Sequence, residues 1–451
     1  MRQTNLELRS NLASGALRSL APLRVQGRVT GVSGLVVEVD GLNGHAMIGD
    51  RVNLTDRDGR RVEAEIVAFR NGNAQTMPFG VLSGIGPGSA ATLASGHGAM
   101  LAISDDWLSR VVDPLGRPLD GKGPLPPGRQ ARPLRAQPPE ATDRARLGQR
   151  LNLGVRALNC FTTCRQGQRL GLFAGSGVGK STLLAMLAKQ TDCDVAVLAL
   201  VGERGREVRE FIEDDLGPDG LARSVVVVAT SDAPPLMRRQ AGHTAMTIAE
   251  HYRDQGKSVL LLMDSVTRFC LAQREIGLSA GEPPATRGYP PSVFAELPRL
   301  LERAGPGIEQ PDGSAGHITA LFTVLVEGDD HNEPIADAVR GILDGHVILD
   351  RRIGEAGRYP AIDILRSLSR AATSCMSAEE IALVRKSRQI LALHGDMADM
   401  VRLGAYQAGT DPAVDEALAL APRIEAVLRQ ERDEITDGDQ AFDLLRTALK
   451  G

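Results

Sequence analysis

Aromatic side chains are scarce in this sequence of 451 residues, which has one tryptophan, four tyrosines and nine phenylalanines. So few rings leave little material for a surface on which the bases of a single nucleic-acid strand could stack. A strong charge of one sign is also missing, because 52 basic and 56 acidic residues give a net charge of −4 with histidine neutral. We therefore expect no dominant basic surface and predict that the protein does not bind nucleic acid.

Long apolar runs and a paired cysteine framework are absent as well. No stretch approaches the roughly 20 apolar residues that a membrane-spanning helix needs, and the N-terminal residues lack the apolar core of a secretory signal. The five cysteines form no paired pattern, which predicts free thiols in a reducing compartment. An integral membrane protein and a disulfide-stapled secreted domain are thus not expected, and we predict a cytoplasmic protein.

What the sequence has is enough length for about three domains at roughly 150 residues each. In residues 1–22 the leucines fall near helical spacing, which fits either a short amphipathic helix or a frayed tail. Over residues 23–95 apolar and polar residues alternate with a period of two, and glycines separate the runs. Short strands at this spacing predict a small all-β barrel or sandwich.

A proline-rich segment follows these strands. Eight of the 25 prolines lie between Asp113 and Glu140. Because proline donates no backbone hydrogen bond, such a segment sustains neither a helix nor a central strand. We therefore predict that residues 96–150 form a linker that wraps the next domain.

Residues 151–370 alternate short, continuously apolar runs with helical patterns. Continuous hydrophobicity is typical of strands buried on both faces, so this region predicts an α/β domain with a mainly parallel sheet. After residue 370 the strands stop, and helical spacing of leucine, alanine and arginine predicts a small helical domain over residues 371–451. The apolar runs are 170–174, 195–201, 224–230, 258–264 and 318–326.

The strongest chemical signal is a glycine-rich turn from Ala174 to Ser181, between the first apolar run and a helical pattern. Its spacing is that of a phosphate-binding P-loop, in which glycines let backbone N–H groups point at phosphate oxygens and the helix N-terminus adds partial positive charge. Lys180 is expected to reach the β- and γ-phosphates of ATP or ADP, and the Ser181 hydroxyl to bind Mg²⁺. The predicted nucleotide-binding residues of this turn are Gly175, Ser176, Gly177, Val178, Gly179, Lys180, Ser181 and Thr182.

Two carboxylates follow other predicted strands. Asp264 closes the run 258–264, where it can hold the Mg²⁺ shell through water, and Glu203 follows the run 195–201, where it can orient and polarise an attacking water. In an open α/β sheet ligands gather at the carboxyl ends of strands, so these side chains and Lys180 are expected to meet. The structural alternatives are a turn-capping aspartate at 264 and a salt-bridged surface loop around Glu203.

The P-loop, Glu203 and Asp264, in this order and on these predicted strands, resemble the corresponding sites in the catalytic subunits of the rotary and hexameric ATPases. This group includes the F-type ATP synthase β subunit. The resemblance covers nearly the whole chain. Within the group the sequence is most similar to the flagellum-specific (flagellar protein export) ATPases of the type III secretion ATPase family, and next to their injectisome relatives. The segments that carry the similarity include Arg110–Gly116, Gly154–Leu158, Glu333–Asp337, Ile342–His346, Gly357–Asp363 and Gly404–Pro412.

The resemblance implies a small N-terminal β-barrel, a central RecA-like P-loop ATPase domain and a small C-terminal helical domain. It further implies that Arg268 contacts the γ-phosphate, that Tyr359 stacks on the adenine and that Arg370 is an arginine finger inserted into a neighbouring subunit's site. A guanidinium contributed across an interface completes the charge stabilisation only when the ring closes, which couples hydrolysis to assembly. An ordinary surface arginine is the alternative for Arg370.

The function that this resemblance implies is Mg²⁺-dependent hydrolysis of ATP by a homohexameric ring that energises type III export of flagellar proteins. The implied partners are a stator-like regulatory protein at residues 1–22, export gate and stalk components, and chaperone–substrate complexes. The implied location is the cytoplasm, peripheral to the export apparatus at the inner membrane.

Four other functions fit the sequence less well. An injectisome ATPase is separated from a flagellar one only by the motif around Asp411 to Ala417. A rotary ATP synthase subunit disagrees with the pattern from Tyr406 to Asp411, and a non-catalytic nucleotide-binding ring subunit lacks a carboxylate like Glu203. An RNA translocase disagrees with the net charge and the few aromatic residues.

Overall fold

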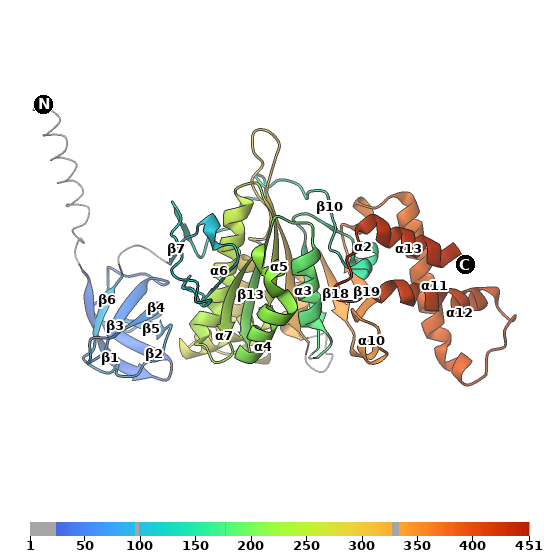
Figure 1. The fold of residues 1–451 in the computed structure, drawn as a ribbon. Helices are drawn as coiled ribbons and strands as arrows, with labels where there is room; N and C mark the ends of the chain where they lie inside the picture. The colour runs from blue at the N-terminus through green and yellow to red at the C-terminus, as the bar shows by residue number, and fades with distance from the viewer. Residues whose placement is uncertain (1–23, 95–98, 176, 327–332, 451) are drawn as a thin grey trace, which may run out of the picture. The chain divides into compact units, whose positions relative to one another are not determined.

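The computed structural model describes residues 24–94, 99–175, 177–326 and 333–450 (Figure 1). The predicted N-terminal helix or tail, with its partner binding, and Ser176 of the P-loop lie outside the described residues. The chain divides into two compact units, of which the first is built on the residues up to Met100 and the second on most of the remainder. The domain boundaries expected at residues 95, 150 and 370 stay predictions.

The first unit contains a six-stranded antiparallel β-barrel. The strands join in the order β1-β2-β5-β4-β3-β6, so the barrel closes on itself. Alternate side chains such as Val37, Val39 and Ile66 are buried in its core, and the sequence alternatives of barrel or sandwich are thereby resolved in favour of a barrel. The strands are β1 Gln26–Ser33, β2 Val36–Asp40, β3 Arg51–Thr55, β4 Arg61–Arg70, β5 Asn73–Pro78 and β6 Ala90–Leu93.

The second unit is built on a nine-stranded sheet. Eight strands follow the order β19-β18-β12-β17-β15-β13-β14-β8, and β16 pairs with β17. Every neighbouring pair is parallel except β18–β19 and β16–β17. The strands are β8 Arg110–Val112, β12 Arg169–Ala174, β13 Val195–Glu203, β14 Ser224–Thr230, β15 Ser258–Asp264, β16 Gly305–Pro306, β17 His317–Leu325, β18 Gly345–Leu349 and β19 Ile362–Ser369.

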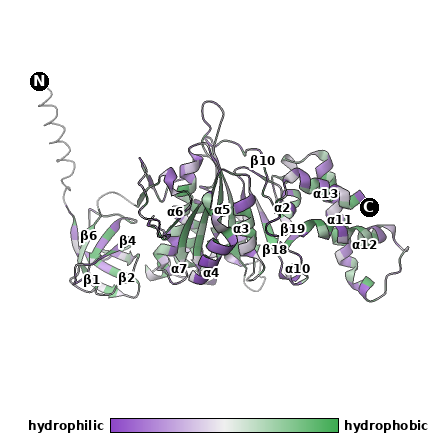
Figure 2. Cartoon of the chain, viewed as in Figure 1, coloured by the Kyte–Doolittle hydropathy of each residue, from purple (hydrophilic) through white to green (hydrophobic). Residues whose placement is uncertain are grey.

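All five predicted apolar runs are strands of this sheet, and they occupy its interior from β12 to β14. Figure 2 shows the hydrophobic residues concentrated along these central strands. Four strands of the sheet were not predicted: β8 and β16 have only three and two residues, β18 has five residues that include His346, and β19 exposes three of its eight residues. The predicted linker therefore contributes one strand, β8, to the sheet. This strand ends at Val112, two residues before Pro114, the first of the eight prolines.

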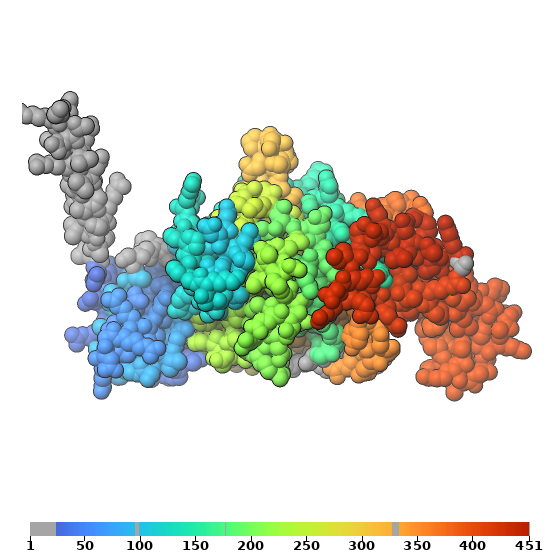
Figure 3. All heavy atoms as spheres, in the orientation of Figure 1, coloured from blue at the N-terminus to red at the C-terminus, as the bar shows by residue number. Residues whose placement is uncertain are grey.

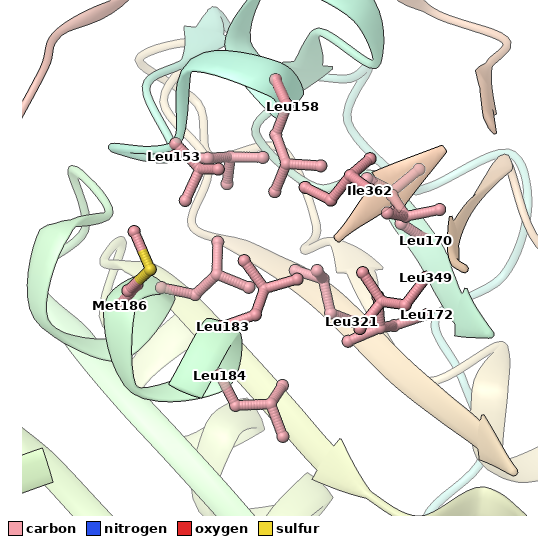
Figure 4. Packing of buried hydrophobic residues seen from close by; sticks show 14 of the residues in the cluster. Leu153, Leu158, Leu170, Leu172, Leu183, Leu184, Met186, Leu321, Leu349 and Ile362 are labelled. Atoms are coloured by element: carbon pink, nitrogen blue, oxygen red, sulfur yellow. The ribbon is translucent and has the colours of Figure 1, made fainter. Parts of the chain in front are cut away.

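Helices connect the strands of the second unit and cover the sheet. Leu183, Leu184 and Met186 of α3 belong to the same buried cluster as Leu172 and Leu321 of the sheet (Figure 4). Burial of these side chains contributes about 1.5–3 kcal/mol each and holds the helix that follows the P-loop. The helices are α2 Arg156–Phe161, α3 Lys180–Gln190, α4 Gly205–Glu210, a π-helix Phe211–Leu216, α5 Gly217–Ala222, α6 Pro235–Arg253, α7 Val266–Ser279, α8 Pro291–Leu301, α9 Pro334–Ile342 and α10 Arg351–Glu355.

Three further helices end the described chain, as the sequence predicted: α11 Ala378–Arg402, α12 Pro412–Leu428 and α13 Gly438–Lys450. A capping box fixes where α11 begins, because the Ser377 hydroxyl accepts from the Glu380 N–H and the Glu380 carboxylate accepts from the Ser377 N–H.

The remaining elements are short or exposed. Among the described helices, none is both long and apolar enough to cross a bilayer. The exposed segment between β16 and β17 projects from the surface of the second unit (Figure 3). The short pieces are β7 Met100–Ala102, β9 Ala131–Pro133, β10 Arg150–Leu151, β11 Cys164–Arg165 and three 3-10 turns at Asp105–Trp107, Thr286–Gly288 and Ala372–Ser374.

Candidate nucleotide-binding and catalytic site

The P-loop joins the central strand β12 to helix α3. Gly177 and Gly179 have φ angles of 76° and 86°, in the left-handed region that glycine adopts without the steric penalty of a side chain. Gly179 precedes Lys180 as the N-cap of α3 and supplies no side-chain acceptor for the first N–H groups of the helix. A helix N-terminus without a side-chain cap suits an anion, because its free N–H groups and its dipole both favour negative charge.

Lys180 lies between the two predicted carboxylates. Its ammonium is 2.5 Å from the Asp264 Oδ1 atom and 3.6 Å from the Glu203 Oε1 atom. All three side chains are at most 16% exposed, so little water screens their charges. The structure thus brings together residues from α3, β13 and β15 at the carboxyl end of the sheet, where the sequence placed them.

Burial raises the pKa of the Glu203 carboxyl above its ordinary value. The positive charges of Lys180 and Arg268 act in the opposite direction, whereas the negative charges of Asp264 and Glu207 add to the rise. A carboxylate with a raised pKa is a stronger base than an exposed one, which suits a group that accepts a proton from water.

Thr323 is a member of this cluster that sequence reasoning missed. It lies on β17, between β12 and β15 in the sheet, and its hydroxyl donates to the Asp264 Oδ1 atom at 2.7 Å. Lys180 and Thr323 therefore both hold the same carboxylate oxygen of Asp264. The available signal was the second of two threonines in a mainly apolar run, the one near its carboxyl end.

Arg268 lies on α7, next to the end of β13. A Cβ atom at Gly202, where φ is +73°, would come within about 3.1 Å of the Arg268 side chain. The side chain therefore packs against the bare backbone that precedes Glu203, and glycine at 202 makes this approach possible. The sequence contained this glycine next to Glu203, but no pattern linked it to Arg268.

Tyr359 is 48% exposed and stands beside the P-loop. A Cβ atom at Gly179 would be 3.4 Å from its ring. A cavity of about 260 Å³ borders the ring, and its apolar wall is formed by Leu183, Met186 and Pro360.

The opposite wall of this cavity is polar and comes from the segment Gln430–Arg432 that follows α12. The main-chain N–H of Gln430 donates to the Tyr359 carbonyl at 2.9 Å, which ties this segment to the tyrosine. Sequence reasoning did not find the segment, because it lies 71 residues after Tyr359 and carries no nucleotide-binding motif.

Arg370 lies away from the P-loop of its own chain. Ser369 pairs with Gly345 in the antiparallel β18–β19 ladder, and its hydroxyl accepts a hydrogen bond from Gln168, which precedes β12. The P-loop follows Ala174 at the other end of β12. Six residues of strand separate the two ends by about 20 Å, which is farther than an arginine side chain extends. Arg370 is exposed, and within the described part of the chain its side chain forms no hydrogen bond or ion pair.

The chemistry of the donors fits a magnesium nucleotide. Across the described ranges, no three histidine, cysteine, aspartate or glutamate side chains gather into a metal cluster. Mg²⁺ in nucleotide sites needs only one or two protein oxygens, because phosphate oxygens and waters complete its shell. Ser181 at the start of α3 and Asp264 at the end of β15 offer such oxygens.

Three family models match the chain. Residues 154–369 match the nucleotide-binding domain of the ATP synthase alpha/beta family, and residues 29–92 match the β-barrel domain of the same family. Residues 376–447 match the T3SS EscN ATPase C-terminal domain.

Whole-length relatives agree with these matches. A flagellum-specific ATP synthase of Caulobacter vibrioides is 53% identical, with 96% of this chain and 98% of that protein covered. The flagellum-specific ATP synthase of Salmonella typhimurium is 48% identical, with 94% of each covered, and a type 3 secretion system ATPase of Xanthomonas euvesicatoria is 46% identical, with 95% of each covered.

The assembled ATPase EscN from the type III secretion system of enteropathogenic E. coli has a similar structure. Its TM-score is 0.86 at 39% identity, covering 94% of this chain and 100% of that one. A second structure, of EscN in complex with its central stalk EscO, has a TM-score of 0.84 at the same identity and coverage.

Proposed function

Because the chain belongs to the ATP synthase α/β family, in the branch of the flagellum-specific ATP synthases and type III secretion ATPases, we propose that it works as a homohexameric ring that energises the export of flagellar proteins. It is a P-loop enzyme that hydrolyses ATP. The observation that carries the mechanism is the contact of Lys180 with both Asp264 and Glu203. The flagellar branch is favoured over the injectisome branch because relatives with flagellar names reach 53% identity.

Each side chain of the cluster has a separate task. Lys180 binds the β- and γ-phosphates, for which its ammonium is positioned at the start of α3. The Glu203 carboxylate orients the attacking water and accepts its proton at an oxygen atom. Arg268, beside Glu203, contacts the γ-phosphate and offsets the negative charge that develops there.

Ser181 and Asp264 would hold the Mg²⁺ ion, which would neutralise phosphate charge. Thr323 fixes the Asp264 carboxylate, because its hydroxyl hydrogen bond restricts the rotation of that side chain. The backbone from Gly177 to Gly179 completes the phosphate cradle, and Thr182 lines the cavity beside Tyr359.

Tyr359 binds the adenine through its ring, and the apolar wall formed by Leu183, Met186 and Pro360 encloses the base. Gln430–Arg432 closes the opposite side, so the segment after α12 takes part in base binding. Nucleotide binding is in this way connected to the C-terminal helices.

Arg370 completes the site of the next subunit. The separation of about 20 Å along β12 argues against a role in its own chain's site, and its exposed side chain is available to a neighbour. A second copy that supplies the missing cation makes hydrolysis depend on assembly.

The partners of the ring follow from its relatives. EscN binds a central stalk, EscO, and we propose that a comparable stalk contacts this ring. We also propose a stator-like regulatory protein at residues 1–22, contact with the export gate, and binding of chaperone–substrate complexes. The ring would then work at the cytoplasmic face of the inner membrane, as a peripheral component of the export apparatus.

The test of the ring is the steady-state rate of ATP hydrolysis against protein concentration. We expect the specific activity to rise steeply with concentration and to level off when assembly is complete, because each site needs Arg370 of a neighbour. The Lys180→Ala variant, measured over the same range, gives the background. A specific activity that is already maximal at the lowest concentration, with the protein monomeric by light scattering, would contradict the shared site.

Replacing Tyr359 by alanine should weaken nucleotide binding with little effect on kcat, because the ring contacts the base and not the phosphates. Stacking of a base on an aromatic ring contributes about 1–3 kcal/mol, so the dissociation constant should rise by roughly 5- to 150-fold. Titration calorimetry with ADP measures it. The Tyr359→Phe variant keeps the ring and should bind almost as the wild type does. Equal losses in both variants would place the base elsewhere.

A further inference from the structure

We propose that Asp344 is a positioning residue for Arg370, and that it connects the segment presenting this arginine to the start of the P-loop strand. The proposal rests on the proposed function, because it takes Arg370 to act in the site of a neighbouring subunit. It adds a residue that lies far from the nucleotide of its own chain.

Asp344 lies between α9 and β18 and bonds to two other segments at once. Its main-chain N–H donates to the Arg169 carbonyl at 2.9 Å, and its carboxylate accepts from the Arg169 main-chain N–H at 3.0 Å and from its guanidinium at 3.3 Å. Its carbonyl accepts from the Arg370 N–H at 2.9 Å. One residue thus joins the first residue of β12 to the residue that follows β19.

Buried hydrogen bonds on the neighbouring residues keep this junction rigid. The Gln168 side chain donates to the Ser369 hydroxyl at 2.9 Å, and the Ser369 hydroxyl donates to the Thr163 carbonyl at 2.8 Å. Gln168, Ser369 and Thr163 are at most 6% exposed. The backbone at Arg370 is therefore held through its own N–H and through the preceding Ser369, while its side chain stays exposed.

A fixed backbone matters for a residue that acts across an interface. A charged group contributes fully to catalysis only when it stands where charge develops, and a displacement of about 1 Å can lower a rate by 10²-fold. The Asp344 carboxylate, paired with Arg169, holds the carbonyl that anchors Arg370. Loss of this ion pair should leave the fold and the chain's own P-loop intact but allow the Arg370 segment to shift.

Glu302, a second carboxylate that pairs with Arg169, provides a matched control. Arg169 NH1 is 2.6 Å from Glu302 Oε2, but no hydrogen bond of Glu302 to Arg370 or Ser369 is present in the described part of the chain. Asp344→Asn and Glu302→Gln each remove one carboxylate charge from Arg169. Only the first loosens the anchor of Arg370, so only the first should lower kcat.

We expect Asp344→Asn to lower kcat by about 10- to 100-fold with KM and ADP affinity unchanged, and Glu302→Gln to stay within about twofold of the wild type. The decisive readout uses mixtures of two chains. Arg370→Ala keeps a complete P-loop, and Lys180→Ala keeps a complete Arg370. Mixed in equal amounts, they should form working interfaces in about a quarter of the positions and so recover activity.

The Asp344→Asn substitution is then introduced into one of the two variant chains at a time, and the mixture is measured again. On the Lys180→Ala chain, which supplies Arg370, it should lower the recovered rate by the same 10- to 100-fold factor as above. On the Arg370→Ala chain it should change the rate by less than about twofold. A purely structural role would lower the rate from either chain alike, and that result, or no loss from either chain, would overturn the proposal.

The mixing experiment distinguishes a failure of this proposal from a failure of the proposed function. If the simple mixture of Arg370→Ala and Lys180→Ala recovers no activity, the shared site itself is wrong. If Asp344→Asn does not fold, Arg169→Lys replaces it, since lysine keeps the charge but loses the two-atom contact with the carboxylate. The loss should again appear only on the chain that supplies Arg370.

Discussion

Replacing Arg370 by alanine is expected to lower kcat by about 10³- to 10⁵-fold, which is the contribution of an arginine finger to phosphoryl transfer. The loss should appear with the nucleotide affinity of each chain unchanged, because Arg370 lies about 20 Å along β12 from its own P-loop. Steady-state hydrolysis at a protein concentration that saturates assembly, together with ADP titration, measures both quantities.

Arg366 provides the control for this experiment. It lies on β19, four residues before Arg370, and its side chain is 48% exposed, so it resembles Arg370 in charge and exposure but pairs with Asp350 at 3.6 Å. Arg366→Ala should keep activity within a few-fold of the wild type. Arg370→Lys should remain strongly impaired, because an ammonium cannot reproduce the planar, two-point contact of a guanidinium with a phosphate. Wild-type kcat in Arg370→Ala would make this residue an ordinary surface arginine.

Replacing Glu203 by glutamine should lower kcat by about 10²- to 10⁴-fold, the usual contribution of a general base. Nucleotide binding should persist, because Lys180 and the P-loop glycines remain. The partly exposed neighbour Glu207, whose carboxylate pairs with Arg204 at 2.6 Å, is the matched control, and Glu207→Gln should retain most of the activity. If Glu203→Gln hydrolyses ATP at the wild-type rate, another group activates the water.

The stability of the Glu203→Gln variant separates a catalytic defect from an unfolded protein. Burial raises the pKa of Glu203 in the folded state, so the folded protein disfavours the ionised carboxylate at pH values above that pKa. The ionised group therefore lowers the free energy of unfolding near neutral pH, and this effect disappears as the pH falls through the unfolded-state pKa. Glutamine does not titrate, so the melting temperature of the variant at neutral pH should equal or exceed that of the wild type.

The same raised pKa predicts the acid limb of the wild-type pH profile. The carboxylate must be ionised to accept a proton, so kcat/KM, which reports the pKa values of the free enzyme, should fall as the pH drops through a value above the ordinary range of glutamate. The residual activity of Glu203→Gln should lack this limb.

The sequence by itself determined the parts of this protein that depend on short-range patterns. Continuous apolar runs placed the five central strands of the sheet, since a strand buried on both faces must be apolar at nearly every position. The spacing of Gly175, Gly177 and Gly179 before Lys180 located the P-loop, because only glycine readily adopts the positive φ angles of 177 and 179. Glu203 and Asp264 followed from their positions at strand ends.

Only the tertiary structure decided which distant residues meet. The closure of the barrel, the edge strands β8 and β19, and the contact of Thr323 with Asp264 depend on strand order and register. The wall of the base cavity at Gln430–Arg432 joins segments that are 71 positions apart or more. The conformational preferences of short segments do not predict which distant residues come into contact, because the packing of the whole unit selects these contacts. The position of Arg370 is of this kind, because the antiparallel register of β19 with β18 sets Ser369 beside Gly345 and so places Arg370 far from the P-loop of its own chain.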